Sequence, residues 1–443
     1  MRKYFGTDGI RRIANTELTP ELVYKVAKAG AYVLSKHTDH APTIFIGRDT
    51  RISGTLIESA MTAGFLSYGA NVKMLGVMPT PAVAYLTKKF KADASVVISA
   101  SHNTFEFNGV KYFSNKGMKI PDELEEEIEE VMDSGKINEL TAVNDKIGTS
   151  EIATELLDEY VYFFRKNFEE DLERLNRDDF VVAVDTANGA TSVVADKVFT
   201  VLGIKHHILN DSPNGININD GCGSTHLEML KQYVIDKKCS LGIAYDGDGD
   251  RCLAVDENGN EIDGDKIIAI ISQYLKSKGK LNKDTIVATV MSNLGLNKYA
   301  KQNELNFVQT KVGDRYVLEE MLKNGYNLGG EQSGHVICLD YNPTGDGILT
   351  SLMIIRAILE QGKKASEVAS IMKAYPQVLI NAKVSSDKKY DFDKDEEIKS
   401  AIEKLNKEFD GNGRVLIRAS GTEPLVRVMI EGEDQDYIKQ KAQ

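Results

Sequence analysis

The densest chemical group in the sequence is three aspartates at alternate positions in Asp246-Gly-Asp248-Gly-Asp250-Arg251. The intervening glycines permit tight backbone turns, so the three carboxylates can converge on one hard divalent cation such as Mg²⁺. An EF-hand calcium loop in a non-catalytic calcium-binding protein is the main alternative, because Glu257 falls where that loop places its bidentate glutamate. Two features weaken this alternative: Arg251 stands where the loop requires glycine, and the flanking runs resemble strands rather than paired helices.

A second group lies in Ser99-Ala-Ser101-His102-Asn103, which follows an apolar run. A serine just past the carboxyl end of a parallel strand lies where α/β folds place their ligands. A protease-like Ser-His relay is disfavoured, because adjacent residues do not readily form the required hydrogen bond and no G-x-S-x-G elbow surrounds Ser101. The alternative is a turn with capped backbone groups.

A third group runs from Arg418 through Ser420, Gly421 and Thr422, between two strand-like runs, and is followed by Arg427. Hydroxyls, backbone N–H groups and forked guanidinium donors together suit a phosphate dianion. An ordinary hairpin turn with flanking arginines is the alternative.

The fourth group, Gly329 to His335, offers polar side chains between glycines that can hydrogen-bond sugar hydroxyls, although a simple polar turn would look similar. The four groups together supply a hydroxyl nucleophile, a metal loop, a sugar-like polar loop and a phosphate loop. This is the set that phosphoryl transfer on a phosphosugar needs.

Strands that alternate with helices are expected to position these loops. Thr19-Pro20 has the cap and first-turn proline of an amphipathic helix. Further helices are predicted over 53–68 and 81–90, and strands over 43–47, 71–77, 94–99, 180–184 and 285–289. Such alternation indicates βαβ units and mostly parallel sheets. Three α/β units built alike are expected, followed by a small α+β domain with a helix and two strands. The glutamate-rich segment 121–133 is interpreted as a solvated helix face.

Length and composition exclude several classes of protein. A chain of 443 residues is long enough for about three domains of ~150 residues. Its net charge of −12 argues against a nucleic-acid partner, because phosphate backbones are bound through clustered Lys and Arg. The four cysteines have no CxxC spacing, which indicates thiols in a reducing compartment. No secretory h-region and no apolar run of ~20 residues is found, so a cytoplasmic location without membrane contact is expected.

Six motifs give the chain a close to full-length resemblance to the α-D-phosphohexomutase family. They are Phe5-Gly-Thr-Asp-Gly-Ile-Arg11, Ser99-Ala-Ser-His-Asn103, Asp246-Gly-Asp-Gly-Asp-Arg251, Thr310-Lys-Val-Gly-Asp-Arg315, Gly330-Glu-Gln-Ser-Gly-His335 and Arg418-Ala-Ser-Gly-Thr-Glu-Pro424. The resemblance implies three similar mixed-sheet α/β domains plus a C-terminal α+β domain around a central active-site cleft. Domain limits of 1–155, 156–256, 257–372 and 373–443 are expected, carrying respectively the phosphoserine, metal, sugar-recognition and phosphate loops.

The resemblance also implies roles for single residues. Ser101 would carry the phosphoryl group, and the nearby Ser99 would not. One Mg²⁺ per chain would be held by the three loop aspartates, and Ser101 would complete its coordination. Activation would need a sugar bisphosphate or phosphorylation of Ser101. Arg251 would stabilise the transferring group and Lys111 would act in general acid–base transfer. The substrate contacts would be Arg11, Glu331, Ser333, His335, Arg418, Ser420, Gly421, Thr422 and Arg427.

Within the family, Gln332 and Ser99 resemble the branch that acts on an amino sugar, and an acidic group such as Asp314 near the 2-position could attract the ammonium. The expected reaction interconverts glucosamine 6-phosphate and glucosamine 1-phosphate through the 1,6-bisphosphate, for UDP-N-acetylglucosamine and cell-wall precursors. Glucose or mannose phosphates are the alternative substrates. The partner is thus a small phosphosugar, and a homodimer is left open. Three departures, Arg12, Thr104 and Phe107, replace the family's usual glycine, proline and aspartate, the last two in the serine loop.

Overall fold

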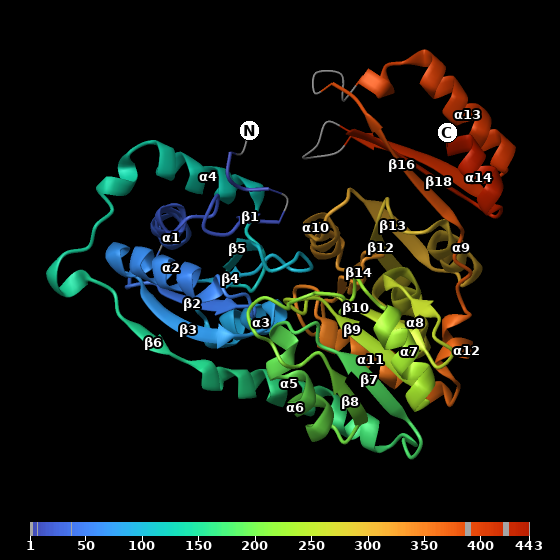
Figure 1. Ribbon diagram of the computed structural model, residues 1–443, viewed down its shortest axis with the longest axis horizontal. Helices are drawn as coiled ribbons and strands as arrows, with labels where there is room; N and C mark the ends of the chain where they lie inside the picture. The colour runs from blue at the N-terminus through green and yellow to red at the C-terminus, as the bar shows by residue number, and fades with distance from the viewer. Residues whose placement is uncertain (1–2, 7, 37, 386–390, 420–424, 443) are drawn as a thin grey trace.

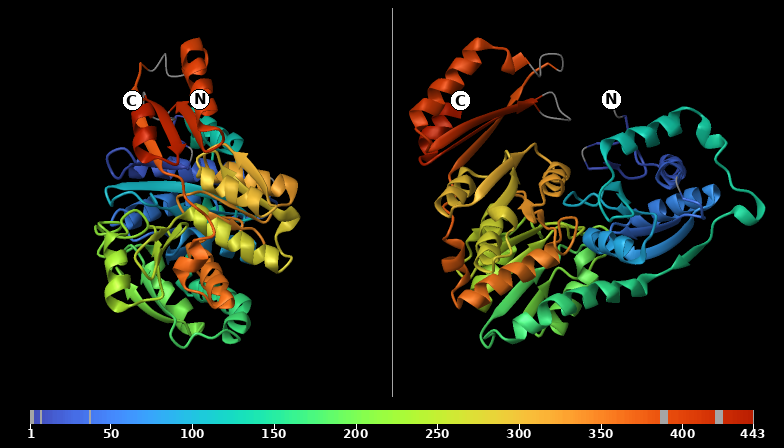
Figure 2. Two further views of the ribbon diagram at one scale, coloured as in Figure 1. Left: turned by 90° about the vertical axis from the view of Figure 1, so that its right-hand side faces the viewer. Right: turned by 180° about the vertical axis from the view of Figure 1, so that it is seen from behind.

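The computed structural model describes residues 3–6, 8–36, 38–385, 391–419 and 425–442 (Figure 1). Within these residues the chain forms sheets of six, five, four and three strands, in chain order. Figure 1 shows the six-stranded unit on one side, the five- and four-stranded units on the other, and the three-stranded sheet above the four-stranded one; Figure 2 gives the same arrangement from two further directions. The expected architecture of three mixed-sheet α/β units and a C-terminal α+β unit is confirmed.

The first sheet has the strand order β1-β5-β4-β2-β3-β6, and only β5 is antiparallel to both of its neighbours. Its strands are β1 (Ile10–Ile13), β2 (Thr43–Arg48), β3 (Asn71–Val77), β4 (Ala94–Ile98), β5 (Phe107–Ser114) and β6 (Ser150–Ile152). Alternate residues of β2 and β4 face opposite sides, so one face meets α1 and α2 and the other meets α3. The helices are α1 (Pro20–Ser35), α2 (Gly54–Tyr68), α3 (Thr80–Phe90) and α4 (Asp122–Asp133).

The second and third sheets repeat the α/β pattern in shorter form. Helix α5 (Leu157–Glu173) leads into the second sheet, ordered β11-β10-β9-β7-β8, and the third is ordered β13-β12-β14-β15. The strands are β7 (Val181–Asp185), β8 (Lys205–Leu209), β9 (Leu241–Tyr245), β10 (Cys252–Asp256), β11 (Glu261–Ile262), β12 (Thr285–Thr289), β13 (Asn306–Thr310), β14 (Leu328–Gly330) and β15 (Val336–Cys338). The helices are α6 (Ala195–Val201), α7 (Glu228–Lys237), α8 (Gly264–Ser277), α9 (Leu294–Gln302), α10 (Asp314–Asn324), α11 (Gly347–Gln361) and α12 (Ala365–Ala369).

The fourth sheet is fully antiparallel, in the order β16-β18-β17, and is covered by two helices. Its elements are β16 (Gln377–Lys383), α13 (Glu396–Phe409), β17 (Gly413–Ala419), β18 (Leu425–Gly432) and α14 (Gln435–Ala442). The loop between β17 and β18 is the predicted phosphate loop. None of the described helices is long and apolar enough to cross a membrane.

Local sequence signals account for the element boundaries that were predicted correctly. The Thr19 hydroxyl accepts a hydrogen bond from the Leu22 N–H, and Pro20 is the first residue of the helix. Helix α1 therefore begins at the position that the sequence predicts. Helix α2 ends at Gly69 in a left-handed conformation (φ 105°), which glycine adopts without strain.

The interpretation of the glutamate-rich helix α4 as a solvated face is wrong for two of its residues. Glu125 is buried and pairs with Arg315 of the third unit, with 3.0 Å between Oε1 and Nη2. Glu129 is buried and accepts hydrogen bonds from three successive backbone N–H groups, those of residues 3–5. The helix therefore anchors the start of the chain and contacts the third unit.

The junction between the third and fourth sheets contains a buried acid that makes stability depend on pH. Burial, together with the neighbouring Asp263 carboxylate, raises the pKa of Asp265 to about 8. Its Oδ2 accepts a hydrogen bond of 2.6 Å from the Asn293 N–H, and the Asn293 amide contacts the Tyr375 backbone. The side chain is thus protonated in the folded state at a pH where the unfolded chain is ionised.

Asp265→Asn is expected to remove part of the pH dependence of folding. Since the folded pKa is the higher one, the contribution of Asp265 is present near its unfolded pKa and is lost as pH rises toward about 8. The variant should gain thermal stability over wild type at about pH 8 and little at about pH 5, measured as Tm. The exposed control Asp236→Asn should leave the wild-type slope unchanged. Parallel curves for Asp265→Asn and wild type would refute the assignment.

Candidate active site

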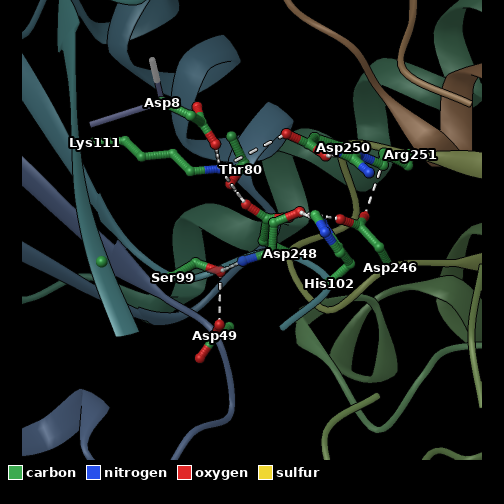
Figure 3. A network of polar contacts seen from close by, with 12 residues as sticks. Asp8, Asp49, Thr80, Ser99, His102, Lys111, Asp246, Asp248, Asp250 and Arg251 are labelled. Carbon is green, nitrogen blue, oxygen red and sulfur yellow. Dashed lines mark hydrogen bonds and ion pairs between the residues drawn. The ribbon is translucent and has the colours of Figure 1, made fainter. Parts of the chain in front are cut away.

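The serine loop begins where β4 ends and presents Ser101 to the second unit. Ser101 is buried, has a left-handed backbone (φ 52°), and donates its hydroxyl proton to Asp246 Oδ2 at 2.6 Å. The hydroxyl of Ser99 donates instead to Asp49 Oδ2 at 2.6 Å and accepts from the Ser101 N–H at 2.9 Å (Figure 3). Ser99 is therefore occupied in supporting the loop, whereas Ser101 faces the aspartates.

The geometry at Ser101 and His102 is not that of a Ser-His relay. His102 Nδ1 lies 3.4 Å from Ser101 Oγ, while the serine proton is directed to Asp246. Burial, and then the cations Arg251 and Arg11, lower the pKa of His102 to about 4. The imidazole is neutral at neutral pH and lies beside the Ser101 hydroxyl without taking its proton.

The three loop aspartates converge as the sequence predicts. One carboxylate oxygen from each of Asp246, Asp248 and Asp250 lies within 4.8 Å of the other two, and all three residues are buried. The loop joins β9 to β10, which pair as an antiparallel hairpin, so its flanks are strands. Glu257 is turned away and accepts hydrogen bonds from the N–H and hydroxyl of Ser366. The EF-hand alternative is thereby excluded.

The residues of this loop fit a divalent cation. Asp248 Oδ1 and Asp250 Oδ1 are buried and accept no hydrogen bond among the described residues. Burial, followed by the carboxylates of Asp250 and Asp248, raises the pKa of Asp246 well above its usual range. Carboxylates packed this closely repel one another unless a proton or a cation lies between them. An oxygen-only donor set of this charge is the kind that Mg²⁺ prefers.

Two basic residues, Lys111 and Arg251, lie on opposite sides of the three aspartates and offset their negative charge (Figure 3). Lys111, on β5, is almost fully buried, and its Nζ lies 3.0 Å from Asp248 Oδ2 and 3.8 Å from Asp250 Oδ2. Burial opposes its charge, but the aspartates outweigh burial and raise the pKa of Lys111. The backbone N–H of Arg251 donates to Asp246 Oδ1 at 3.1 Å. The side-chain Nε of Arg251 lies 3.9 Å from Asp250 Oδ1.

The loop of the third unit that was predicted to contact the sugar reaches the same centre through His335. Its Nδ1 lies 3.6 Å from Asp250 Oδ2, and its Nε2 lies 3.1 Å from the Gly345 backbone nitrogen. Glu331 Oε1 accepts a hydrogen bond from the Gly313 N–H at 3.2 Å, and burial raises the Glu331 pKa. The Ser333 hydroxyl oxygen is buried with no described partner, so it can bond a ligand hydroxyl.

A row of alternating charges extends from the first unit to the third and joins three residues singled out from the sequence, Arg11, Asp314 and His335, through two that were given no role there. Arg11 Nη2 donates to Asp8 Oδ2 at 2.7 Å, and its Nη1 donates to Asn103 in the serine loop at 3.1 Å. Lys119 bonds both Asp8 and Asp314, and the Asp314 carboxylate lies 3.3 Å from His335 Nε2. Asp8 lies inside a motif already singled out by the sequence; Lys119 carries no local signal.

A small cavity adjoins the third-unit end of this row. It measures about 200 Å³ and is lined in part by Met118, Lys119, Asp314, Arg315 and His335. Its lysine and arginine are each paired with a carboxylate, and most of its other lining residues are apolar, among them Leu318, Leu322 and Ile337. Asp314, predicted to lie near the sugar 2-position, thus borders an open space while being paired with two basic side chains.

The phosphate loop is described only at its two ends. Arg418 on β17 and Arg427 on β18 are directly opposite cross-strand partners. Burial, and then the charge of Arg427, lower the pKa of Arg418, which is the electrostatic situation that a bound anion relieves. Ser420, Gly421 and Thr422 lie outside the described residues.

The three departures from the family pattern have distinct positions. Arg12 on β1 donates to the Lys3 carbonyl at 3.0 Å, away from the serine loop. The carbonyl groups of Thr104 and Phe107 both accept hydrogen bonds from Arg51. Since these contacts use backbone atoms, the altered side chains leave the loop anchored. Gln332 donates to Asp263, the cap of α8, at 3.2 Å.

Comparison with known protein families gives a match to phosphoglucomutase/phosphomannomutase descriptions along the whole chain. The alpha/beta/alpha domains I, II and III match residues 2–139, 158–259 and 263–375, and the C-terminal domain matches 379–443. The four matches follow the order of the four sheets.

Among curated proteins, the phosphoglucosamine mutase of Ruminiclostridium cellulolyticum is 53% identical over 442 residues, covering 100% of this chain and 97% of its own. That of Clostridium acetobutylicum is 53% identical over 438 residues, covering 99% and 96%. Among solved structures, a phosphoglucomutase/phosphomannomutase family protein from Burkholderia thailandensis has a TM-score of 0.81 at 20% identity, covering 99% and 95%. Aspergillus fumigatus N-acetylphosphoglucosamine mutase, in complex with GlcNAc-6P and magnesium, has a TM-score of 0.71 at 18% identity, covering 100% and 94%.

Proposed function

Because this chain belongs to the phosphoglucomutase/phosphomannomutase family, we propose that it interconverts glucosamine 6-phosphate and glucosamine 1-phosphate through a phosphoserine enzyme and a glucosamine 1,6-bisphosphate intermediate. It is an isomerase that acts as an intramolecular phosphotransferase. The observation that carries the proposal is the hydrogen bond from Ser101 to one of three convergent, buried carboxylates. The product would supply amino sugar for UDP-N-acetylglucosamine and cell-wall precursors.

The proposed cofactor is one Mg²⁺ per chain, held by Asp246, Asp248, Asp250 and an oxygen of Ser101 or its phosphate. When bound, the cation neutralises charge on the transferring phosphoryl group. The Oδ1 atoms of Asp248 and Asp250, which are buried and accept no hydrogen bond among the described residues, support this assignment.

The transfer step is assigned to residues from the first and second units. The bond between phosphorus and Ser101 Oγ breaks as a bond forms to a sugar hydroxyl oxygen, so Oγ gains a proton and the sugar hydroxyl loses one. The neighbouring aspartates hold Lys111 protonated, and its ammonium is the proposed donor of the proton to Oγ; the amine left behind takes up the sugar proton. A cation held by the same aspartates would offset the charge that raises the Lys111 pKa and so favour this transfer. Arg251 is assigned to the transferring group, which is negatively charged.

The second half-reaction returns the other phosphate of the bisphosphate to Ser101, so the substrate must turn end for end. A single anion site must therefore hold either phosphate. The opposed guanidinium groups of Arg418 and Arg427 support such a site, with Ser420, Gly421 and Thr422 as further proposed donors. Arg11, Glu331, Ser333 and His335 are proposed to contact the sugar, and activation would need a sugar bisphosphate or prior phosphorylation of Ser101.

The choice of sugar is tested by product analysis. Purified protein primed with glucose 1,6-bisphosphate is expected to interconvert glucosamine phosphates with a kcat/KM well above that for glucose or mannose phosphates. Separate incubations with each 6-phosphate, followed by chromatography of the 1-phosphates, would measure this. Turnover of glucose or mannose phosphates without glucosamine phosphates would overturn the proposed substrate and retain the mutase reaction.

Four broader expectations remain part of the proposal: the domain limits, the location, the partner and the oligomeric state. The domain limits 1–155, 156–256, 257–372 and 373–443 place one loop of the site in each domain. A cytoplasmic location is supported by four buried cysteines, none in a disulfide. The partner is a small phosphosugar, and a homodimer stays a prediction to be tested by solution mass.

A further inference from the structure

The backbone that carries Ser101 is held by a buried arginine from another loop. Arg51 follows β2 and its side chain has no exposed surface. Nε donates to Asp49 Oδ2 at 2.8 Å, Nη2 donates to the carbonyl groups of Ser101 and Asn103 at 2.9 and 2.8 Å, and Nη1 donates to those of Thr104 and Phe107. A guanidinium has five N–H donors, and here each one has its own acceptor. One side chain thereby fixes the serine loop at four backbone positions.

A second donor reaches the same carbonyl groups from the second unit. The amide of Asn219 donates to the carbonyl groups of Ser101 and Asn103 at 2.8 and 2.9 Å, and Asn219 is buried. At Gly247 of the metal loop, a Cβ would lie 2.6 Å from the Ser101 carbonyl oxygen and 2.8 Å from the Asn219 amide. The serine loop, the amide and the metal loop therefore meet at one point, and no larger residue fits at Gly247.

The contacts form a closed ring around the nucleophile. Asp49 accepts from Arg51 and from the Ser99 hydroxyl, and Ser99 accepts from the Ser101 N–H. The Ser101 carbonyl completes the ring by accepting from Arg51. Both backbone polar groups of Ser101 are thus bonded, in a left-handed conformation that serine rarely adopts. With the backbone fixed, the direction of Oγ toward Asp246 is set.

We infer that Arg51 and Asn219 are positioning residues that hold Ser101 in line with the metal-binding aspartates, Arg51 from within its own unit and Asn219 across the interface between units. Neither is assigned to substrate or metal. The inference rests on the proposed function, because it presupposes that Ser101 is the phosphoryl carrier. Transfer depends steeply on alignment, since a displacement of about 1 Å can lower the rate about 100-fold.

Asn219→Gly and Arg51→Lys test this inference. Glycine removes the amide and accepts the positive φ of 57° at position 219 without strain. Lysine keeps the charge of Arg51 but cannot reach four carbonyl groups in a planar fork. Both variants are expected to lower kcat about 10- to 100-fold while leaving KM for the sugar phosphate within about twofold. Asn15→Gly and Arg48→Lys are the matched controls. Asn15 is an exposed asparagine that also has a positive φ, 60°, and Arg48 is an arginine near Arg51 that pairs with Glu58 instead of the serine loop.

A second measurement separates positioning from simple loss of fold and from failure of the proposed substrate. The rate at which glucose 1,6-bisphosphate phosphorylates Ser101, followed by intact mass, should fall in Asn219→Gly and Arg51→Lys in parallel with kcat. It does not depend on which sugar is the natural substrate. Thermal melts identify folded variants, and Asn219→Gly carries the test if Arg51→Lys does not fold. Wild-type phosphorylation rates and kcat in a folded Asn219→Gly variant would overturn the inference.

Discussion

Replacing Ser101 with alanine is expected to abolish turnover, lowering kcat by about 10⁴-fold or more. The hydroxyl oxygen is the atom on which the phosphoryl group would be carried, and no other group can form that bond at the same place. Ser101 Oγ donates to Asp246 at 2.6 Å, so the substitution also removes one contact between the serine loop and the metal loop. Initial rates in bisphosphate-primed assays would measure the loss.

Ser99→Ala is the matched control, because it removes a hydroxyl two residues away. Ser99 bonds Asp49 and the Ser101 N–H, so its loss should weaken the loop and lower kcat moderately while phosphate is still found on Ser101. Peptide mapping by mass spectrometry would locate the phosphate in each protein. Phosphate on Ser99, together with an active Ser101→Ala variant, would reverse the assignment of nucleophile and support.

The parts of the fold that were predicted from sequence are those whose signals are local. The strand β3 and the helix α2 follow from runs of apolar residues with a fixed period and a terminal glycine. The strand β5 was missed because its buried residues include Asn108, Gly109 and Lys111, so its sequence has neither an apolar run nor an alternation of apolar and polar positions. It lies between β1 and β4, and the sequence carries no signal of that pairing.

The same distinction applies to the site. Three aspartates within five positions converge because the chain needs only tight turns to bring them together. The approach of Thr80 and Lys111 to Asp248 spans 168 and 137 positions, so no spacing rule could have predicted it. Glu125 looked like a solvated glutamate for the same reason, because its partner Arg315 is 190 positions away.

Arg51 lies between these two cases, because its turn has a local sequence signal and its burial does not. The segment from Gly47 to Arg51 reads as a polar turn after a strand, similar to the turns that follow β7 and β12. A charged side chain in a polar turn is normally expected at the surface. It is buried because four carbonyl groups of the serine loop and the Asp49 carboxylate offer one acceptor for each N–H group. Recognising this required the loop conformation itself.

The second large effect is expected from the metal ligands. Asp248→Asn should lower Mg²⁺ affinity and reduce kcat/KM by about 100-fold or more, because affinity for a hard cation follows the number of charged ligands. Its Oδ2 already accepts from Thr80 at 2.8 Å and from Lys111 at 3.0 Å, so Oδ1, which has no described partner, is the atom available to a cation. An amide in this place lowers the negative charge of the triad and faces the Lys111 ammonium.

Titrating activity and binding heat with Mg²⁺ after removal of metal by EDTA would measure both effects. Wild type should lose activity on chelation and regain it with Mg²⁺, and Asp248→Asn should need a higher Mg²⁺ concentration for half-maximal rate. Glu257→Gln is the matched control, since Glu257 would be a ligand only in the excluded calcium loop and instead bonds Ser366. If Glu257→Gln lost cation affinity and Asp248→Asn did not, the cation would lie outside the three-aspartate site. If both kept wild-type affinity and rate, Lys111 and His335 would be sufficient to neutralise the triad, and the buried carboxylates would serve the fold rather than the reaction.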